Sequence, residues 1–201
     1  MKMNIEDRRF EMQKLEALHK LREAIKKGEV DENALEILNF INSLPDFYTT
    51  SSCSGRISLF VELGSKPENY WLGKWHREVS LDEILERLKK LPSKGVIWLR
   101  YEPSIFHIVA KSLEKAKKVL EIARSSGYKR AGIQVLKEGR FVVEIADTER
   151  IDVPIGENSK LFIQEDYLKH LVRFANEKFR KGSRKLKRLE SNLMKELKDQ
   201  N

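Results

Sequence analysis

The stretch IFHIVAKSLEKAKKVLEIARSSGYKRAGIQVLKEGRFVVEIA, residues 105–146, decides the fold class. It begins with a run of strand formers, and Ser112 then provides an N-cap for a helix that Gly127 closes. Two further strands, 131–136 and 140–146, are separated by a Lys-Glu-Gly turn that is typical of a hairpin. A crossover helix combined with a hairpin predicts an α+β fold on a mixed β-sheet with flanking helices.

The sequence on either side carries the same two kinds of signal. Further helices are predicted over residues 4–27, 31–45, 80–91 and from 165 onward, with Asp31 as the N-cap of the second and Ser80 and Glu83 as a capping box for the third. Further strands are predicted over 57–63, 95–101 and 151–153. The segment with Pro67 and Gly73 is expected to be a loop, and Pro154 is expected to end its strand. Strand, helix and paired strands thus follow one another twice, which predicts a weak internal structural duplication without a convincing sequence repeat.

Length and composition are typical of one soluble domain. The chain has 201 residues, of which 40% are hydrophobic, and this suffices for one buried core. We expect a single domain made of N-terminal helices (1–45), a mixed α+β core (46–175) and a basic helical tail (176–201). Because no apolar run approaches the roughly 18 residues that span a bilayer, and the N-terminus does not resemble a signal peptide, we predict a cytoplasmic protein without membrane contact.

The ionisable residues favour an anionic partner and argue against a metal centre. Cys53 is the single cysteine, and the four histidines are spread along the sequence, so we predict no metal site. The net charge of +8 favours a nucleic acid as the partner. Nothing in the sequence sets the oligomeric state.

Residues 178–189, KFRKGSRKLKRL, form the most basic segment. It contains no acidic residue and seven basic ones, Lys178, Arg180, Lys181, Arg184, Lys185, Lys187 and Arg188. Leucines recur at spacings of three and four from Leu186 to Leu197, which indicates a helix that packs one face against other parts of the chain. The basic residues therefore have two interpretations, a solvated helix face or an arm that neutralises RNA phosphates.

Residues 49–56, TTSSCSGR, form the least ordinary segment. Hydroxyl groups surround Cys53, and a glycine and an arginine lead into a strand. Hydroxyls and backbone amides can bind a phosphate or carboxylate, glycine permits close approach of the backbone to a ligand, and arginine adds a bidentate grip. The structural alternative is a polar turn with a buried cysteine. A nucleophilic Cys53 would need a nearby base, such as His107 or His76.

Three short motifs in order resemble the signatures of the wybutosine-synthesis methyltransferase family in its archaeal form. The segment at 49–56 is similar to SxSSCxGR, with Thr49 where the family has serine. GxxW is matched by residues 95–98, and PxxxH is matched by residues 103–107. The likeness extends from the first predicted helix to Asn176.

The resemblance implies an enzyme that transfers a methyl group from S-adenosylmethionine to a ring nitrogen of a 4-demethylwyosine derivative beside the anticodon of phenylalanine tRNA. It also implies a fold distinct from the Rossmann-type methyltransferases, in agreement with the missing GxGxxG pattern. The residues expected to bind cofactor or substrate are Ser51, Ser52, Cys53, Ser54, Gly55, Arg56, Gly95, Trp98, Glu102 and Pro103.

Individual roles follow from the chemistry of these side chains. His107 is the candidate general base, because histidine side chains ordinarily titrate near neutral pH. Glu102 is a candidate to balance the sulfonium or to orient His107, and Trp98 is a candidate to stack on a base or on the sulfonium. His76 follows two tryptophans in a predicted loop, which is a candidate tRNA-stacking surface. The alternatives are a hydrogen-bonded structural histidine, a core aromatic and surface residues.

Two other classes of protein share parts of this pattern. A non-catalytic RNA-binding protein would carry the basic tail and the aromatic residues but would bind no cofactor. A Cys-dependent hydrolase would react with electrophiles at Cys53. Binding of S-adenosylmethionine distinguishes the first class from the methyltransferase, and thiol blocking distinguishes the second.

Overall fold

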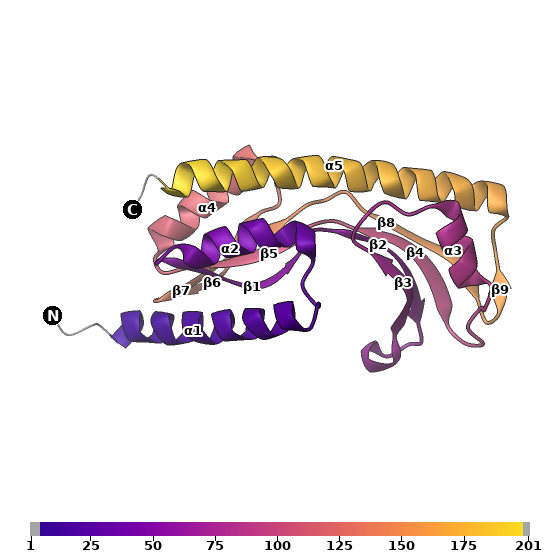
Figure 1. Ribbon diagram of the computed structural model, residues 1–201, viewed down its shortest axis with the longest axis horizontal. Helices are drawn as coiled ribbons and strands as arrows, with labels where there is room; N and C mark the ends of the chain where they lie inside the picture. Colours follow the sequence, from indigo (N-terminus) through magenta and orange to yellow (C-terminus); the bar gives the residue numbers. More distant parts are fainter. Residues whose placement is uncertain (1–4, 199–201) are drawn as a thin grey trace. The chain divides into compact units, whose positions relative to one another are not determined.

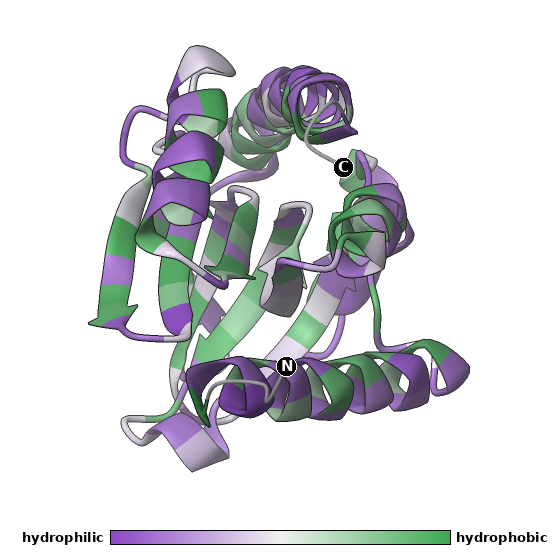
Figure 2. Ribbon diagram, turned by 90° about the vertical axis from the view of Figure 1, so that its left-hand side faces the viewer, coloured by the Kyte–Doolittle hydropathy of each residue, from purple (hydrophilic) through white to green (hydrophobic). Residues whose placement is uncertain are grey.

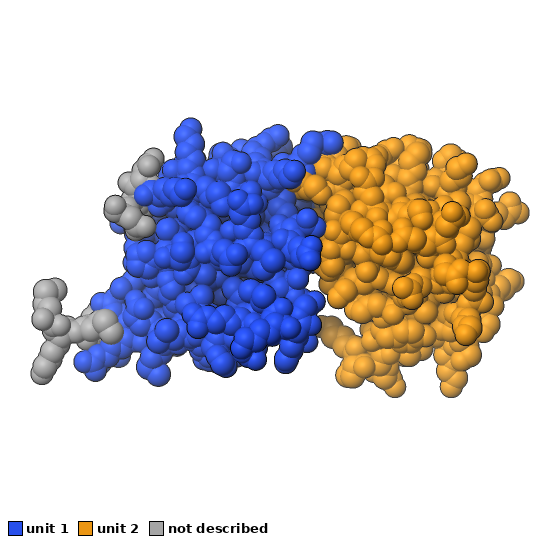
Figure 3. Space-filling model, in the orientation of Figure 1, with its two compact units in different colours: residues 1–54, 104–148, 184–201 blue, residues 55–103, 149–183 orange. Residues whose placement is uncertain are grey.

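The computed structural model describes residues 5–198 and divides into two compact units, each with its own β-sheet (Figures 1 and 3). Unit 1 comprises residues 1–54, 104–148 and 184–201, and unit 2 comprises residues 55–103 and 149–183. The predicted α+β class is confirmed, since both units combine helices with a sheet. That the chain folds as a single domain stays a prediction.

Unit 1 is built on a four-stranded sheet in the order β1-β5-β7-β6. Its elements are α1 (Ile5–Lys26), η1 (Glu32–Ala34), α2 (Leu35–Ser43), β1 (Phe47–Cys53), β5 (Ile105–Ala110), α4 (Leu113–Ser125), β6 (Gly132–Lys137), β7 (Arg140–Ala146) and the end of α5 (Glu165–Lys198). Helix α1 covers one face of the sheet, where Phe10 packs with Tyr48 and Val109 (Figure 1). Helices α2, α4 and α5 cover the other face and enclose the larger core with the hydrophobic residues of the strands (Figure 2).

The C-terminal tail is the second half of one continuous helix, α5. Its leucines, from Leu186 to Leu197, are buried in the core of unit 1, which confirms the packing predicted from their spacing. Leu168 and Leu171, in the first half of the same helix, are buried in the core of unit 2. No helix within residues 5–198 has the length and apolar character needed to cross a membrane.

Unit 2 is built on a five-stranded sheet in the order β3-β2-β4-β8-β9. Its elements are β2 (Arg56–Glu62), η2 (Lys66–Glu68), β3 (Tyr70–Trp75), α3 (Leu81–Leu88), β4 (Val96–Glu102), β8 (Ile151–Glu157), β9 (Lys160–Leu161) and the start of α5. Alternate residues of β2 and β4, such as Leu59 and Leu99, point into a core that α3 and α5 share. Ser80 and Glu83 form the predicted capping box of α3.

All strand pairings within residues 5–198 are antiparallel, whereas the sequence predicts a mixed sheet. The crossover helix α4 does make β6 run parallel to β5, but β7 returns between them and pairs with both. Unit 1 therefore has the order strand, helix and paired strands, whereas β2 to β4 of unit 2 have paired strands, helix and strand. The predicted duplication of one order of elements is not found in the described part of the chain.

Three further predictions of loops or strand ends are wrong. Residues 47–53 form the strand β1, so the interpretation of residues 49–56 as a polar turn is wrong over residues 49–53. Gly73 lies inside β3, where the Trp75 indole packs so closely that a Cβ on this glycine would lie 2.2 Å from the ring. Pro154 lies inside β8, at a register shift opposite Trp98, where an irregular ladder tolerates the missing N–H of proline.

Candidate active site

The signature segment at 49–56 begins on β1, which carries a β-bulge at this point. Thr49 pairs with Ile108 of β5, and Ser52 pairs with Phe106, so two residues of β1 stand opposite the single residue His107. A bulge of this kind redirects side chains locally, which is why bulges recur beside active sites. Here it directs Ser51 towards His107.

A hydrogen-bonded chain runs from Ser51 through His107 to Glu144. The Ser51 hydroxyl lies 2.8 Å from Nδ1 of His107, and Nε2 of His107 lies 2.9 Å from a carboxylate oxygen of Glu144. A carboxylate only accepts hydrogen bonds, so a neutral His107 that donates to Glu144 carries its proton on Nε2, which leaves Nδ1 to accept from the Ser51 hydroxyl. Strand pairing fixes the second contact, because His107 of β5 and Glu144 of β7 are direct partners in the sheet.

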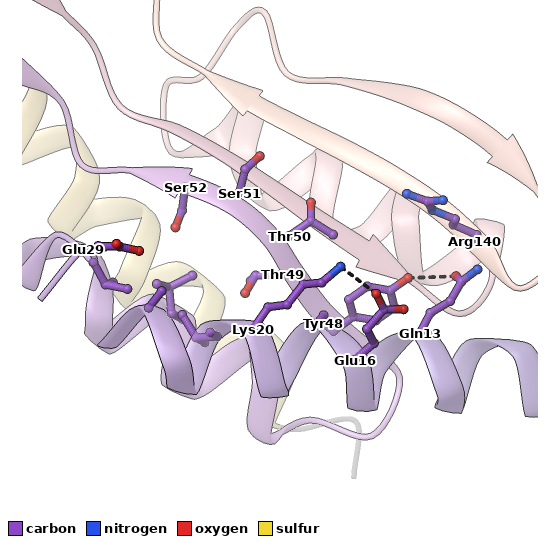
Figure 4. A pocket seen from close by; sticks show the side chains of 15 residues that line it. Gln13, Glu16, Lys20, Glu29, Tyr48, Thr49, Thr50, Ser51, Ser52 and Arg140 are labelled. Atoms are coloured by element: carbon purple, nitrogen blue, oxygen red, sulfur yellow. Dashed lines mark hydrogen bonds and ion pairs between the residues drawn. The ribbon is translucent and has the colours of Figure 1, made fainter. Parts of the chain in front are cut away.

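A groove of about 680 Å³ opens beside this strand in unit 1 (Figure 4). Helix α1 forms one wall and β1 forms another. The polar side chains that line the groove are Gln13, Glu16, Lys20, Glu29, Tyr48, Thr49, Thr50, Ser51, Ser52 and Arg140. Ser51 belongs both to this lining and to the hydrogen-bonded chain, whereas His107 is not among the lining residues.

Two residues that the sequence analysis did not assign to the site anchor the signature segment. Asn42 of α2 accepts a hydrogen bond from the Thr49 amide and donates one to the Thr49 hydroxyl, at 2.9 and 2.8 Å. Asp31 caps the following helix as predicted, and its second carboxylate oxygen accepts hydrogen bonds from the amide and hydroxyl of Ser54. The hydroxyl at position 49 thus accepts a hydrogen bond from Asn42, and either serine or threonine supplies such a hydroxyl.

In unit 2 the signature segment ends in an arginine that is already engaged. Arg56 makes a bidentate contact with Glu102, at 2.7 and 3.3 Å, and its guanidinium lies 4.6 Å from the ring of Trp71. Arg56 and Glu102 are direct partners of β2 and β4. The expectation that Glu102 orients His107 is corrected, because the carboxylate bound to His107 is that of Glu144. His76 follows β3, and its Nδ1 lies 3.0 Å from the carbonyl oxygen of Gly55.

The GxxW motif supports the sheet of unit 2. Gly95 has φ +92°, and a Cβ there would lie 2.6 Å from a backbone oxygen of Glu62, so only glycine fits. Trp98 donates from Nε1 to the Glu62 carboxylate at 2.9 Å, and the guanidinium of Arg100 lies 5.3 Å from its ring. Pro103 separates β4 from β5, which belong to different sheets. Gly95 and Trp98 therefore both have a structural role in the sheet of unit 2.

Comparison with known proteins places this geometry in a family. A family model described as Methyltransferase TYW3 matches residues 12–195. The chain belongs to this family. The resemblance seen in the three motifs is thereby confirmed, and so is the assignment as a methyltransferase, which implies that the site receives a methyl donor.

Named relatives and solved structures agree with the family assignment. The chain is 47% identical over 186 residues, 92% of its length and 94% of the relative's, to a Pyrococcus horikoshii protein named tRNA(Phe) 7-((3-amino-3-carboxypropyl)-4-demethylwyosine(37)-N(4))-methyltransferase 1. A Thermococcus sibiricus protein of the same activity name is 41% identical, covering 96% of this chain and 98% of its own. The solved PH1069 protein of Pyrococcus horikoshii is 44% identical with a TM-score of 0.86, covering 96% of this chain and 99% of its own. A solved Aeropyrum pernix protein has a TM-score of 0.69 at 26% identity, covering 82% and 98%.

The seven basic residues proposed for tRNA contact fall into two groups within this family member. Three of them form ion pairs with acidic side chains of their own unit, Lys178 with Glu149, Arg180 with Glu78, and Lys185 with Asp147. The other four, Lys181, Arg184, Lys187 and Arg188, are exposed on α5, and none has an ion pair within residues 5–198. The side chains of the second group are the ones available for contact with phosphates.

Proposed function

We propose that this chain transfers the methyl group of S-adenosylmethionine to N4 of 7-(3-amino-3-carboxypropyl)-4-demethylwyosine at position 37 of tRNA(Phe), the activity named for its relatives. One observation carries the proposal: Ser51, which is hydrogen-bonded to His107, also lines a groove to which other signature residues contribute. A hydroxyl–imidazole pair at the wall of a groove supplies what proton removal from a ring nitrogen requires. This role agrees with a cytoplasmic protein whose macromolecular partner is tRNA.

The groove fits S-adenosylmethionine in size and in chemistry. Its volume of about 680 Å³ lies in the range of small-molecule sites. The hydroxyls of Thr50, Ser51 and Ser52 offer hydrogen bonds, while Glu16, Lys20, Glu29 and Arg140 supply both signs of charge for an ammonium and a carboxylate. The Lys20 ammonium, 2.6 Å from Glu16, lowers the pKa of that carboxyl and favours its charged form. When bound, S-adenosylmethionine supplies an electrophilic methyl group on a sulfonium.

The protein's contribution to such a reaction is alignment and proton removal. Methyl transfer is an in-line displacement, so the accepting nitrogen must be held about 3 Å from the methyl carbon with water excluded. A ring nitrogen that bears a proton must also lose it as the new bond forms. His107 is the base that we assign to this proton, because its Nδ1, unprotonated when Nε2 donates to Glu144, accepts a hydrogen bond from the Ser51 hydroxyl at the groove.

The test is transfer of a labelled methyl group. The full chain is incubated with methyl-labelled S-adenosylmethionine and tRNA from cells that lack this gene, and the label in the tRNA is counted. We predict incorporation into tRNA(Phe) and none into tRNA from cells that have the gene. Calorimetry with S-adenosylmethionine alone distinguishes a non-catalytic RNA-binding protein, which would bind the tRNA without the cofactor.

The structure removes one of the two candidate bases of the alternative Cys-dependent hydrolase. Such an enzyme needs a base directed at Cys53. Both nitrogens of His107 are engaged by Ser51 and Glu144, so this histidine is not directed at the thiol, and His76 is the candidate base that this alternative retains. We therefore expect Cys53→Ser to retain most of the methyl transfer, and an abolished rate in a folded Cys53→Ser variant would bring thiol chemistry back.

A further inference from the structure

Both ring nitrogens of His107 already have hydrogen-bond partners, so neither is free to contact a substrate directly. Nδ1 is 2.8 Å from the Ser51 hydroxyl, and Nε2 is 2.9 Å from the Glu144 carboxylate. The His107 side chain is 24% exposed and does not line the groove, whereas Ser51 is exposed and does. A proton that leaves a molecule in the groove therefore meets the Ser51 oxygen before it meets the imidazole.

We propose that Ser51 is the catalytic residue that takes this proton, in a relay Ser51–His107–Glu144 in which Glu144 is a positioning residue. The proposal rests on the proposed methyl transfer and adds two residues with distinct roles to it. Ser51 contacts the substrate and His107 receives the proton. Glu144 acts only through His107.

The proton transfers balance without a further reactant. The N–H bond of the accepting ring breaks, its proton forms a bond to the Ser51 oxygen, and the Ser51 hydroxyl proton moves to Nδ1 of His107. The electron pair left on the ring nitrogen forms the bond to the methyl carbon, and the carbon–sulfur bond electrons stay with the sulfur. The resulting imidazolium faces the Glu144 carboxylate, which stabilises its charge until the proton passes to solvent.

Glu144 sets the direction of this relay by selecting one tautomer of His107. Because a carboxylate accepts but does not donate, it holds the proton on Nε2 and keeps Nδ1 open towards Ser51. The register of β5 and β7 places the two residues opposite each other, and the Gln134 amide donates to the other Glu144 oxygen at 3.2 Å. The carboxylate is thus held by two contacts, as expected of a group that orients another.

The first test reads the tautomer without turnover. The full chain is labelled with ¹⁵N-histidine, and the ring nitrogens of His107 are assigned by comparison with His107→Gln. The proposal predicts a protonated Nε2 and an unprotonated Nδ1 in neutral His107, and a loss of this preference in Glu144→Gln. A proton on Nδ1 in the wild-type chain would overturn the relay, and this result would leave the proposed methyl transfer intact.

The second test is kinetic and uses matched variants. Ser51→Ala should lower kcat about 100- to 10,000-fold with little change in KM, the usual contribution of general base catalysis, and Ser51→Thr should recover most of it because it keeps the hydroxyl. Glu144→Gln should lower kcat similarly, while Glu121→Gln, an exposed carboxylate on α4, should not. Wild-type kcat in Ser51→Ala, or equal kcat in Glu144→Gln and Glu121→Gln, would overturn the proposal.

Discussion

The ammonium of Lys185 lies 2.6 Å from a carboxylate oxygen of Asp147, whose side chain is only 2% exposed. The same ammonium lies 5.7 Å from the ring centre of Tyr128. Lys185 is one of the seven basic residues of the tail, yet this geometry assigns it to the packing of unit 1. Basic residues of one helix can therefore have different roles, and measurements of stability and of tRNA affinity distinguish these roles.

Removing the ammonium from Lys185 should destabilise the fold. Lys185→Met leaves the buried Asp147 carboxylate without its cationic partner, and we expect the free energy of unfolding to fall by about 1–3 kcal/mol. Lys187→Met, at an exposed position on the same helix, should change it by no more than about 0.5 kcal/mol. Urea unfolding of both variants is the measurement, and equal stabilities would refute the structural role of Lys185.

Reversing the exposed charges should instead affect binding of tRNA. Arg184→Glu, Lys187→Glu and Arg188→Glu should each weaken affinity and reduce the slope of log affinity against log salt by about 0.7–0.9 for each phosphate that is no longer neutralised. Lys117→Glu on α4 is the control for the change in net charge. If the control lowers the slope as much as the three tail variants do, α5 is not a specific contact surface. Deleting the tail is a poor experiment, since it removes the buried leucines.

Arg56 allows a test of whether the signature arginine serves a ligand or the sheet. If it grips an anionic group, Arg56→Ala should lower kcat/KM by about 10- to 150-fold, the usual cost of removing a charge-assisted hydrogen bond. Arg56→Lys should recover only part of this, because lysine lacks the planar fork. Glu102→Gln removes the negative charge that pairs with Arg56 in the protein, and it should lower kcat/KM far less than Arg56→Ala does. Equal losses in Arg56→Ala and Glu102→Gln, with lowered melting temperatures, would assign the pair to sheet stability.

Tyr128 should make the fold sensitive to alkaline pH. Burial raises the pKa of Tyr128 to about 12, and its hydroxyl lies 2.9 Å from that of Ser104. Since this exceeds the value of about 10 for tyrosine in an unfolded chain, the contribution is intact below pH ~10 and is lost as pH rises towards 12.

Over that interval the free energy of unfolding of the wild-type chain should fall by about 1.4 kcal/mol per pH unit relative to Tyr128→Phe. Tyr167→Phe, at a tyrosine that is 50% exposed, should follow the wild-type slope. Chemical unfolding between pH 9 and 12 measures these slopes, and parallel curves for Tyr128→Phe and wild type would contradict the assignment.

Local signals predicted most of the fold. Ser112 does cap α4, since its side chain accepts from the Lys115 amide, and β6 and β7 do form the predicted hairpin. Strand β1 was not predicted because FYTTSSC lacks the alternation of apolar and polar residues that indicates a half-buried strand, and because it pairs with residues of β5 more than fifty positions away. Strand β3 escaped because Gly73 reads as a loop residue until the packing of Trp75 is known.

The site was predictable only as far as the motifs extend. Ser51 and His107 belong to two motifs, and the fold does bring them together. Glu144 lies on a strand with no motif, 37 positions from His107, and its sequence context looks like an ordinary solvent-facing carboxylate. Asp31 was predicted as a helix cap, but one carboxylate has two oxygens, and the second role depends on where Ser54 lies.

The most direct test of the proposed activity is nucleoside mass spectrometry of tRNA(Phe) after reaction with the full chain and S-adenosylmethionine. We predict that 7-(3-amino-3-carboxypropyl)-4-demethylwyosine gains one methyl group, that fragmentation places it on the tricyclic base, and that Ser51→Ala slows this gain while Ser51→Thr does not. An unchanged nucleoside, with a known methyltransferase active in the same extract, would contradict the proposed function.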